Sequence, residues 1–570
     1  MKALWRYIKP YMGRMSLGLV IKLVGTLMDL VLPWVLARML DVIVPSGNVK
    51  QIYLYGLLMV FCAFIAVVFS VGANRMASRV SSIIAKDIRR DLFAKVTRLS
   101  FAGADRYSVP SLISRLTNDT YNVHQLIDRS QRLGVRAPLL MLGGMVMAFL
   151  LEPTLALVLT ILAPLLILVV LFVSKTGIPL YVAVQKSVEG LVRTVRENAS
   201  GVRVVKALSK EAYEKTRFSD INEAVADAEK RAGVIMAVTN PTMGLLLNAG
   251  LMLVILIGAK RVNLGLMQPG TIIAFLSYFT IILNATLSVT KIFVLWSRGS
   301  ASAGRIAEIL TSPDDAPETS ADHRENAPFL SFENVAFSYN GRRNNLENIS
   351  FTLKKGGTLG ILGPTGSGKT TLVSLLMRFY DAGSGEIRIG GDLVSSIPRG
   401  ELSKRFGVVF QNDTFLTDTV YENISFLREL PMEDVVRAAE TAQAAAFIEN
   451  LPKTYDYRLE IRGMNLSGGQ RQRLLIARAL AGNPEILVLD DAESALDYRT
   501  TALLRASLRR NYPDTTLIVI SERISSLQAA DRILVLDDGR EQGLGTHAEL
   551  METCPAYRRI ANVQMGGAPA

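Results

Sequence analysis

A glycine-rich loop that ends in lysine and threonine has the clearest chemical meaning in this sequence. It follows an apolar run, residues 358–362, and precedes a helical pattern. Glycines let backbone N–H groups turn around a polyphosphate, and the helix N-terminus adds positive potential. Lys369 can reach the outer phosphates, and the Thr370 hydroxyl can hold Mg²⁺. We therefore predict that the phosphates of a nucleotide are bound by Gly363, Pro364, Thr365, Gly366, Ser367, Gly368, Lys369, Thr370 and Thr371.

Two further polar residues follow apolar runs and could complete a magnesium site. The run at residues 486–489 ends at Asp490, which is the arrangement of a Walker B strand. Gln411 follows a second run, residues 408–410. Oxygen atoms of carboxylate, amide and hydroxyl groups are the ligands that Mg²⁺ prefers. The predicted metal-binding set is Thr370, Gln411 and Asp490.

A second potential phosphate-binding helix start lies between these motifs. Leu466 is followed by Ser467, Gly468, Gly469 and Gln470, and then by a helical stretch rich in Ala and Leu. A serine hydroxyl and glycine N–H groups at a helix N-terminus are suited to a phosphate. One site cannot use both helix starts on the same γ-phosphate, but two chains that face each other head to tail can. The pattern therefore favours a dimer with composite sites.

In their order, these motifs resemble those of ABC exporters, and specifically of half-transporters. The set comprises the loop 363–370, Gln411, the signature 466–470, the strand 486–490 and residues 494–497, Ser-Ala-Leu-Asp. The resemblance covers almost the whole chain. It implies a membrane domain of six long transmembrane helices with the type I exporter fold, followed by an α/β P-loop ATPase domain. It also implies that two ATPase domains sandwich two ATP molecules, and that Tyr339 stacks on adenine; the alternative is an ordinary strand tyrosine.

Two positions depart from the family pattern where hydrolysis takes place. The residue after Asp490 is normally a glutamate that orients or deprotonates the attacking water, but here it is Asp491, which reaches about 1.5 Å less far. After the switch strand, residues 518–521, Glu522 stands where the family has a histidine. An ionised glutamate donates no hydrogen bond and would repel a γ-phosphate. The candidate catalytic residues are Asp491, Glu522 and Gln411, and because two of them are altered we expect this site to hydrolyse ATP poorly. The alternative is a fully active site with compensating residues.

The front half contains the apolar runs that must cross a membrane, each of which needs about 20 residues. They begin near Leu17, Ile52, Ala137, Thr154, Val234 and Thr271. Only residues 152–153 separate the third run from the fourth, which predicts a tight hairpin. The intervals 72–136 and 175–233 are rich in Lys and Arg, which places them and the N-terminus on the cytoplasmic side. Their helical periodicity predicts long helical extensions with turns near 108–111 and 198–201, and the resemblance implies that these turns contact the ATPase domains.

The first predicted span carries two charges on one helical face, Lys22 and Asp29. Charge inside a membrane is costly and usually faces a cavity or a partner. We interpret these residues as a structural ion pair together with a lysine that reaches toward the interface. The alternative is that they line a substrate path.

Composition argues against several other classes of protein. Lys plus Arg number 63 against 51 Asp plus Glu, a net charge of +12, and the excess lies in the front half. With 49% apolar residues, a membrane explains this charge better than nucleic acid, and we expect no nucleic-acid partner. Cys62 and Cys554 lie far apart and have no metal-ligand spacing. The polar, proline-bearing residues 312–327 predict a linker between a membrane domain, 1–311, and the ATPase domain, 328–570.

Together these features predict the degenerate-site subunit of a heterodimeric exporter. We expect a multi-pass protein of the plasma membrane, in contact with lipid, whose N-terminus and ATPase domain are cytoplasmic. Its own Walker motifs bind ATP, while its intact signature completes the active site of a second ABC half-transporter. The expected cargo is lipophilic: a drug, a lipid or a hydrophobic peptide. The alternatives are a slow homodimeric exporter that hydrolyses ATP with Asp491, and an ATP-gated regulator or channel that does not pump.

Overall fold

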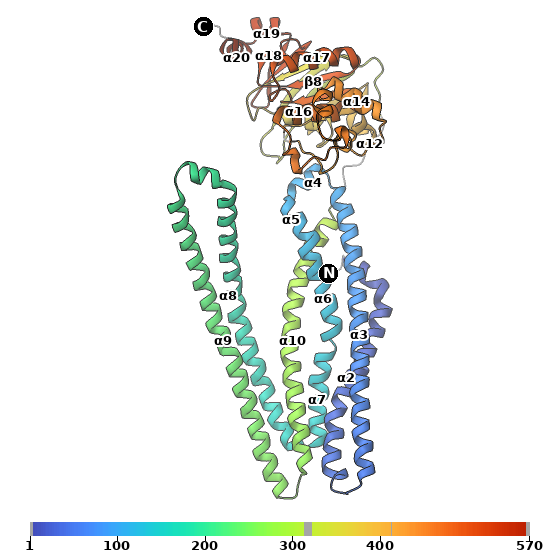
Figure 1. The fold of residues 1–570 in the computed structure, drawn as a ribbon, viewed down its shortest axis with the longest axis vertical. Coiled ribbons are helices and arrows are strands. Elements are labelled where there is room, and N and C mark those ends of the chain that lie inside the picture. Colours follow the sequence, from blue (N-terminus) through green and yellow to red (C-terminus); the bar gives the residue numbers. More distant parts are fainter. Residues whose placement is uncertain (1–3, 313–321, 412, 566–570) are drawn as a thin grey trace. The chain divides into compact units, whose positions relative to one another are not determined.

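The chain folds into two compact units, and each is described by itself. The computed structural model describes residues 4–312, 322–411 and 413–565. The first unit consists of the described residues of Met1–Arg98 and Tyr107–Ser312, and the second of those of Leu99–Arg106 and Pro313–Ala570 (Figure 1). A short segment near residue 100 therefore belongs to the second unit, although helices of the first unit precede and follow it in the chain.

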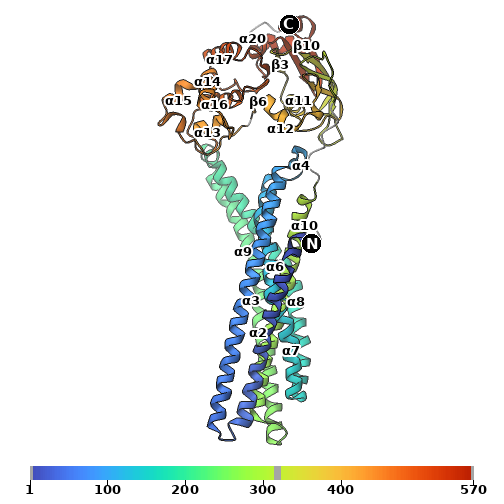
Figure 2. The same cartoon turned by 90° about the vertical axis from the view of Figure 1, so that its right-hand side faces the viewer.

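Long helices form the first unit (Figures 1 and 2). With the two short helices α1 and α5 included, the helices of this unit are α1 (Trp5–Ile8), α2 (Met12–Arg38), α3 (Val49–Thr97), α5 (Val109–Ser114), α6 (Thr120–Leu133), α7 (Arg136–Leu151), α8 (Pro153–Ala207), α9 (Glu211–Asn263) and α10 (Pro269–Leu310). Within the described residues, five segments are long and apolar enough to cross a membrane, namely Trp5–Ile43, Val49–Thr97, Val109–Leu151, Pro241–Asn263 and Pro269–Thr286. The predicted fourth span lies at the start of α8, where the described apolar stretch is the shorter Pro153–Leu162.

The connection between α7 and α8 is the predicted tight hairpin. α7 ends at Leu151, α8 begins at Pro153, and Glu152 between them is extended, with φ −158° and ψ 101°. The residue before a proline avoids the helical region, whereas proline itself fits the first position of a helix because its missing N–H is not needed there. The Glu152 carboxylate pairs with Arg261 of α9 at 3.1 Å, which ties the hairpin to the next helix.

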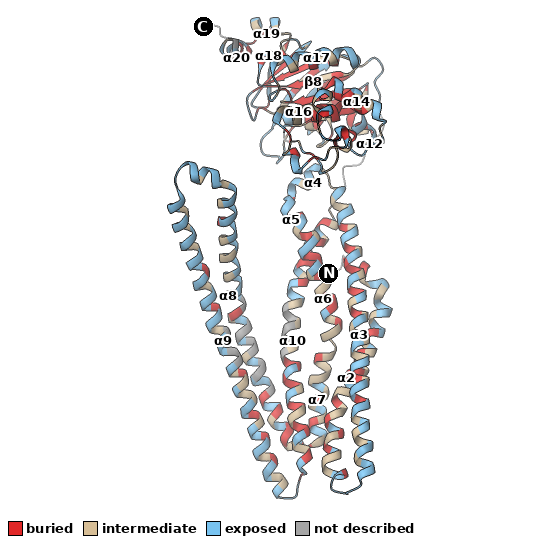
Figure 3. Ribbon diagram, viewed as in Figure 1, coloured by how far each residue is buried: buried red, intermediate tan, exposed pale blue. Residues whose placement is uncertain are grey.

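α8 and α9 pack side by side along their length (Figure 1). They contain 55 and 53 residues, far more than a span requires, and so agree with the predicted helical extensions. The predicted turn at 198–201 is wrong, because α8 continues to Ala207 and the chain turns at residues 208–210. Asn198 faces α9 instead, where its side-chain amide donates to Glu214 at 2.7 Å. The end of the pair that carries this turn is largely exposed (Figure 3).

The other predicted contact turn, 108–111, is also misplaced. Ser108 precedes α5, whose first turn contains Pro110, and this helix belongs to the first unit. The segment that packs within the second unit is the upstream helix α4 (Phe101–Arg106). The short contact helix that we expected therefore exists, but it lies earlier in the chain.

Lys22 and Asp29 find separate partners on neighbouring helices. The Lys22 ammonium is buried and donates to Ser70 Oγ at 2.8 Å and to Asn74 Oδ1 at 3.2 Å, both on α3. The ion pair at Asp29 is formed with Arg136 of α7, at 3.1 Å, and not with Lys22. Both charges therefore hold α2 to adjacent helices, in agreement with a structural role. The prediction that Lys22 reaches toward the interface is wrong, because its ammonium is buried against α3.

A sheet with mixed strand directions forms the core of the second unit. Its order is β5-β4-β1-β2-β10-β9-β3-β8-β7-β6. The strands are β1 (Leu330–Phe337), β2 (Leu346–Leu353), β3 (Thr358–Leu362), β4 (Ser384–Ile389), β5 (Asp392–Leu393), β6 (Phe406–Val409), β7 (Ile486–Asp490), β8 (Thr516–Ile520), β9 (Arg532–Asp537) and β10 (Arg540–Gly545). β9, β3, β8, β7 and β6 are parallel to their neighbours in that order. Such strands are buried on both faces, which explains their near-continuous apolar sequences.

Helices of the second unit pack around this sheet (Figure 2). They are α4, α11 (Lys369–Leu376), α12 (Arg399–Leu402), α13 (Val420–Ser425), α14 (Met432–Thr441), α15 (Ala445–Glu449), α16 (Gly468–Leu480), α17 (Tyr498–Asn511), α18 (Ile524–Leu527), α19 (His547–Thr553) and α20 (Pro555–Met565). One buried cluster joins α11 to the sheet, and a second surrounds α16. A third joins the end of β3 to α18 and α20.

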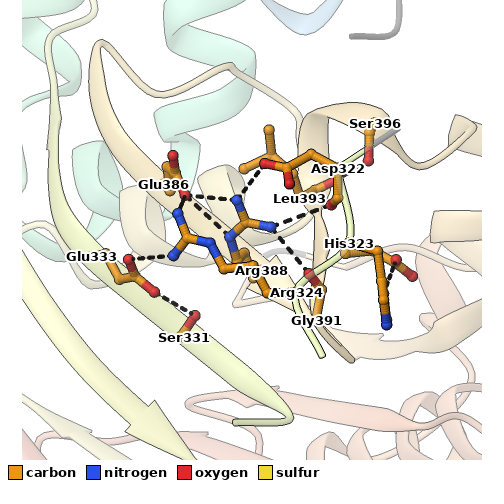
Figure 4. A network of polar contacts seen from close by, with 11 residues as sticks. Asp322, His323, Arg324, Ser331, Glu333, Glu386, Arg388, Gly391, Leu393 and Ser396 are labelled. Carbon is orange, nitrogen blue, oxygen red and sulfur yellow. Dashed lines mark hydrogen bonds and ion pairs between the residues drawn. The ribbon is translucent and has the colours of Figure 1, made fainter. Parts of the chain in front are cut away.

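The predicted linker, 312–327, is described only in part, because residues 313–321 lie outside the described residues. A network of charged side chains fixes its last residues, among them Asp322 and Arg324, to an edge of the sheet (Figure 4). Arg388 of β4 is fully buried, and its guanidinium donates to Asp322 at 2.5 Å and to Glu386 at 2.8 Å. Arg324 donates to the same Glu386 at 2.7 Å. The Arg388 hydrogen bond lowers the pKa of the Asp322 carboxyl below its usual range. The network therefore anchors the chain where it enters the second unit.

Candidate nucleotide-binding site

The glycine-rich loop connects β3, in the interior of the sheet, to the N-terminus of α11. Gly366 and Gly368 have φ values of 86° and 101°, in the left-handed region that side chains disfavour. A Cβ at Gly368 would lie 2.7 Å from Leu346 Cδ2. A Cβ at Gly363 would lie 2.4 Å from both the Leu536 carbonyl oxygen and the Ser367 hydroxyl. Glycine is therefore required at these positions by backbone conformation or by close approach.

The side chain of Lys369, near the end of the loop, bonds back to the start of the loop. Its ammonium donates to the carbonyl oxygens of Gly363 at 2.7 Å and Pro364 at 2.8 Å. The Ser367 hydroxyl is buried and has no hydrogen-bond partner within the described residues. A cradle of glycine N–H groups with one fixed ammonium at a helix N-terminus suits the phosphates of a nucleotide.

Asp490 ends β7 beside the start of α11. Its Oδ2 lies 3.5 Å from the Thr370 hydroxyl, so one carboxylate and one hydroxyl oxygen face a common point. Burial raises the pKa of Asp490, while the Thr370 hydroxyl lowers it. The described residues contain no cluster of three or more His, Cys, Asp or Glu suited to a metal. Mg²⁺ usually keeps several waters and takes one or two protein oxygens together with substrate phosphates.

An open polar cleft of about 410 Å³ brings most of the predicted residues together. Its lining includes Thr365, Gly366, Gly368, Lys369, Thr370, Thr371, Gln411, Asp490, Asp491 and Glu522. Asn345 and Ser521 also line the cleft, and sequence reasoning missed both. Asn345 stands in no recognised motif. Ser521 could have been found, because it ends the same strand pattern that placed Glu522.

The two departures from the family pattern face this cleft. Asp491 has φ 52°, and its N–H donates to the Ile520 carbonyl of β8 at 3.0 Å, which fixes the backbone just after Asp490. Glu522 Oε1 accepts a hydrogen bond from the Thr365 hydroxyl at 3.0 Å and lies 3.8 Å from Lys369 Nζ. A carboxylate therefore stands beside two groups that the loop offers to phosphate.

The signature forms the N-terminus of α16 and does not line the cleft. Ser467 is the N-cap, and its Oγ accepts from Gln470 N–H at 3.3 Å, while the Gln470 side chain accepts from Ser467 N–H at 2.9 Å. This capping box stabilises the start of the helix, and Gly468 and Gly469 are its first two residues. The structure thus brings the Walker residues together within one chain but keeps the signature apart from them.

Tyr339 lies at the edge of an aromatic cluster and is about half exposed. Its ring plane is nearly perpendicular to those of Phe337 and Tyr380, whose centroids lie 4.8 and 5.0 Å away. Its hydroxyl lies 3.3 Å from Thr371 Oγ1 on α11. An aromatic ring next to the phosphate loop, with part of its surface open, can stack on a nucleotide base.

Helix α4 packs against the same aromatic cluster. Phe101 stacks on Phe379 with ring centroids 3.9 Å apart and an interplanar angle of 18°. The Tyr380 hydroxyl donates to Asp105. Burial raises the pKa of Tyr380, and the hydrogen bond to the Asp105 carboxylate raises it further. Through Tyr380, α4 is connected to the residue that we expect beneath the base.

Comparisons with known proteins agree with these features. Residues 15–286 match the family model of the ABC transporter transmembrane region, and residues 346–494 match the ABC transporter model. The chain is 34% identical to the uncharacterized ABC transporter ATP-binding protein YfiB of Bacillus subtilis over 562 residues, which covers 98% of each chain. It is 31% identical to the putative ABC transporter ATP-binding protein exp8 of Streptococcus pneumoniae over 571 residues, 99% of this chain and 97% of the relative. Its fold matches a bacterial Atm1-family ABC exporter with ATP bound, with a TM-score of 0.81, 24% identity and coverage of 98% and 99%.

A helical membrane unit and a sheet-containing unit with a phosphate loop define an ATP-driven membrane transport protein. The chain belongs to the ABC transporter family, and its fold is that of the Atm1-family exporters. It is an integral membrane protein with several spans and a cytoplasmic ATPase domain. ABC ATPase domains in general use ATP with Mg²⁺, and ABC exporters work as dimers.

Proposed function

We propose that this chain is the subunit of a heterodimeric exporter that carries the hydrolysis-impaired nucleotide site. The observation that carries the proposal is the position of Glu522, whose carboxylate accepts from Thr365 and lies 3.8 Å from Lys369. At this place the family pattern requires a histidine that donates to the γ-phosphate. Asp491, one methylene shorter than the usual glutamate, lines the same cleft and adds a second defect.

ATP binding follows from the residues of the cleft. The loop N–H groups and Lys369 would hold the phosphates, and Tyr339 would support the base. Thr370, Asp490 and Gln411 would hold Mg²⁺, which on binding would neutralise phosphate charge. With a short carboxylate at Asp491 and no donor at Glu522, this arrangement favours retention of the nucleotide over its hydrolysis.

The signature serves the partner in this proposal. Ser467 and Gly469 lie at an intact, capped helix start that does not line the chain's own cleft. A helix N-terminus of this kind can bind the phosphates of a nucleotide held by another subunit. We therefore expect the partner to carry the glutamate and histidine that this chain lacks.

A lipophilic cargo is the class that the membrane unit favours. An apolar groove of about 480 Å³ lies between α8 and α9, lined by Leu168, Val169, Phe172, Thr176, Ile235, Val238 and Thr242. Five of these seven side chains are hydrocarbon or aromatic, so the groove suits an apolar molecule such as a drug, a lipid or a hydrophobic peptide. Export, powered mainly by hydrolysis at the partner's Walker motifs, is the proposed activity.

The test compares the chain alone with the chain and its native partner. Purified alone in lipid nanodiscs, the chain should bind MgATP but hydrolyse it slowly. In sealed vesicles, the partnered complex should drive uphill movement of a lipophilic dye. Robust hydrolysis by the lone chain would refute the degenerate-site proposal, and conductance without uphill movement would favour an ATP-gated channel.

A further inference from the structure

Glu522 is held toward the phosphate loop by its backbone as well as by its side chain. The segment from Ser521 to Ile524 follows β8 at the edge of the cleft. Arg523 N–H donates to Ser521 Oγ at 3.0 Å, which closes a local turn around Glu522. On the other side, Glu522 Oε1 accepts from Thr365 Oγ1 at 3.0 Å. The carboxylate is therefore held against the glycine-rich loop from outside it.

The C-terminal helix α20 fixes this turn from behind. Gln564 Nε2 donates to the Glu522 carbonyl at 2.7 Å, and Gln564 Oε1 accepts from Ile524 N–H at 2.9 Å. One amide thus bridges the residues on both sides of Arg523. The helix itself is anchored by Tyr557 and Ala561, which are buried in the same cluster as Ile524. The turn that carries Glu522 is therefore tied to a packed helix and not only to its neighbours in the chain.

We propose that Glu522, positioned by Gln564, makes this site bind nucleoside diphosphates and triphosphates with nearly equal affinity. The inference rests on the proposed function and deepens it. In a P-loop site the lysine contacts the β- and γ-phosphates, and the family pattern adds a switch histidine that donates to the γ-phosphate. Here one carboxylate takes the Thr365 donor and partly neutralises Lys369, so the added phosphate of ATP meets repulsion where it would otherwise find donors.

The expected effect is modest because Glu522 is largely exposed. Its side chain is 61% exposed, so its charge is screened as in water. Two unit charges about 4 Å apart in water interact by a free energy that corresponds to about a fivefold change in an equilibrium constant. Removing the charge should therefore raise the affinity for MgATP about fivefold and change the affinity for MgADP much less.

The test measures the ratio of the dissociation constants of MgADP and MgATP. The full chain in lipid nanodiscs is loaded with a fluorescent ATP analogue, which is displaced by each nucleotide on ice, where hydrolysis is negligible. The wild-type ratio should be near one, and Glu522→Gln should raise it about fivefold. Gln564→Ala should raise it in the same direction, because the carboxylate loses its position. Glu401→Gln, an exposed carboxylate on α12 outside the cleft, is the matched control and should leave the ratio unchanged.

Three outcomes would overturn the inference. One is a wild-type chain that already prefers MgATP tenfold or more; the second is a ratio that Glu522→Gln leaves unchanged. The third is an equal shift of both constants in Gln564→Ala, which would indicate a merely structural role for the amide. A separate assay of phosphate release distinguishes these results from failure of the proposed function. Slow hydrolysis with an unchanged ratio refutes only this inference, whereas rapid hydrolysis by the lone chain refutes the degenerate site.

Discussion

Restoring both altered residues of the cleft should produce an active ATPase, whereas restoring one should give only about a hundredth of that rate. Asp491→Glu lengthens the side chain by about 1.5 Å, and a misplacement of this size can cost about a hundredfold in rate. Glu522→His removes the carboxylate 3.8 Å from Lys369 Nζ and supplies a donor. Loss of one donor to developing charge typically costs about 10²–10³-fold. Since the two effects are separate, the double variant should exceed the wild-type rate by about 10⁴-fold, which corresponds to about 5.5 kcal/mol of barrier.

Phosphate release by the full chain in lipid nanodiscs measures this gain. Asp491→Glu alone should reach only about one hundredth of the double variant's rate, because Glu522 still opposes the γ-phosphate. Lys369→Ala in the double variant gives the background rate of phosphate release, since it removes the ammonium of the phosphate loop. Binding of MgATP is measured in parallel, so that a change in affinity is not mistaken for a change in rate. Full turnover by Asp491→Glu alone would refute the reasoning about a paired defect.

Three further results are expected from other parts of the chain. One test uses mixed dimers of a wild-type copy and a copy that carries both restoring changes. Ser467→Ala should abolish phosphate release when it is placed in the wild-type copy and have little effect when it is placed in the restored copy. Equal effects in the two copies would argue against a composite site. Phe101→Ala removes the ring stacked on Phe379 and should reduce dye transport by the partnered complex severalfold with MgATP binding unchanged; loss of binding would instead indicate damage to the fold. Arg388→Ala should lower the Tm by about 5 °C at pH 7 relative to the wild type, with Arg388→Lys as the control. Because Arg388 lowers the pKa of Asp322, this stabilisation is present above the ordinary aspartate pKa of about 3.9 and is lost as the pH falls through the lower folded value, so the Tm difference should narrow in scans below about pH 4.

Much of the fold was predictable because its signals are local. Long apolar runs fix spans by length, and Pro153 marks the break between α7 and α8 by its missing N–H. The turn at 198–201 was predicted wrongly because its small and polar residues resemble a turn. Asn198 stays helical because its amide bonds to Glu214 on the neighbouring helix, a tertiary contact with no signal in sequence. The same limit applies to α4, since only the contacts of Phe101 show that this segment joins the second unit.

The site was predicted in part, and the reason is again the range of the interactions. Lys369, Thr370 and Asp490 stand in motifs whose spacing encodes their geometry, and the cleft contains all three. Asn345 has no motif, and it reaches the cleft because β2 begins beside the phosphate loop. Gln564 lies far along the chain from Glu522, and only the packing of α20 brings them together.

The packing of α4 has a consequence for anyone who would prepare the C-terminal half as a soluble fragment. A fragment cut after the linker lacks residues 99–106, and with them the ring that covers Phe379 and the acceptor of the Tyr380 hydroxyl. An aromatic surface left uncovered in this way attracts other copies of the fragment. Grafting the missing octapeptide back beside that surface would be expected to keep the fragment monodisperse in solution.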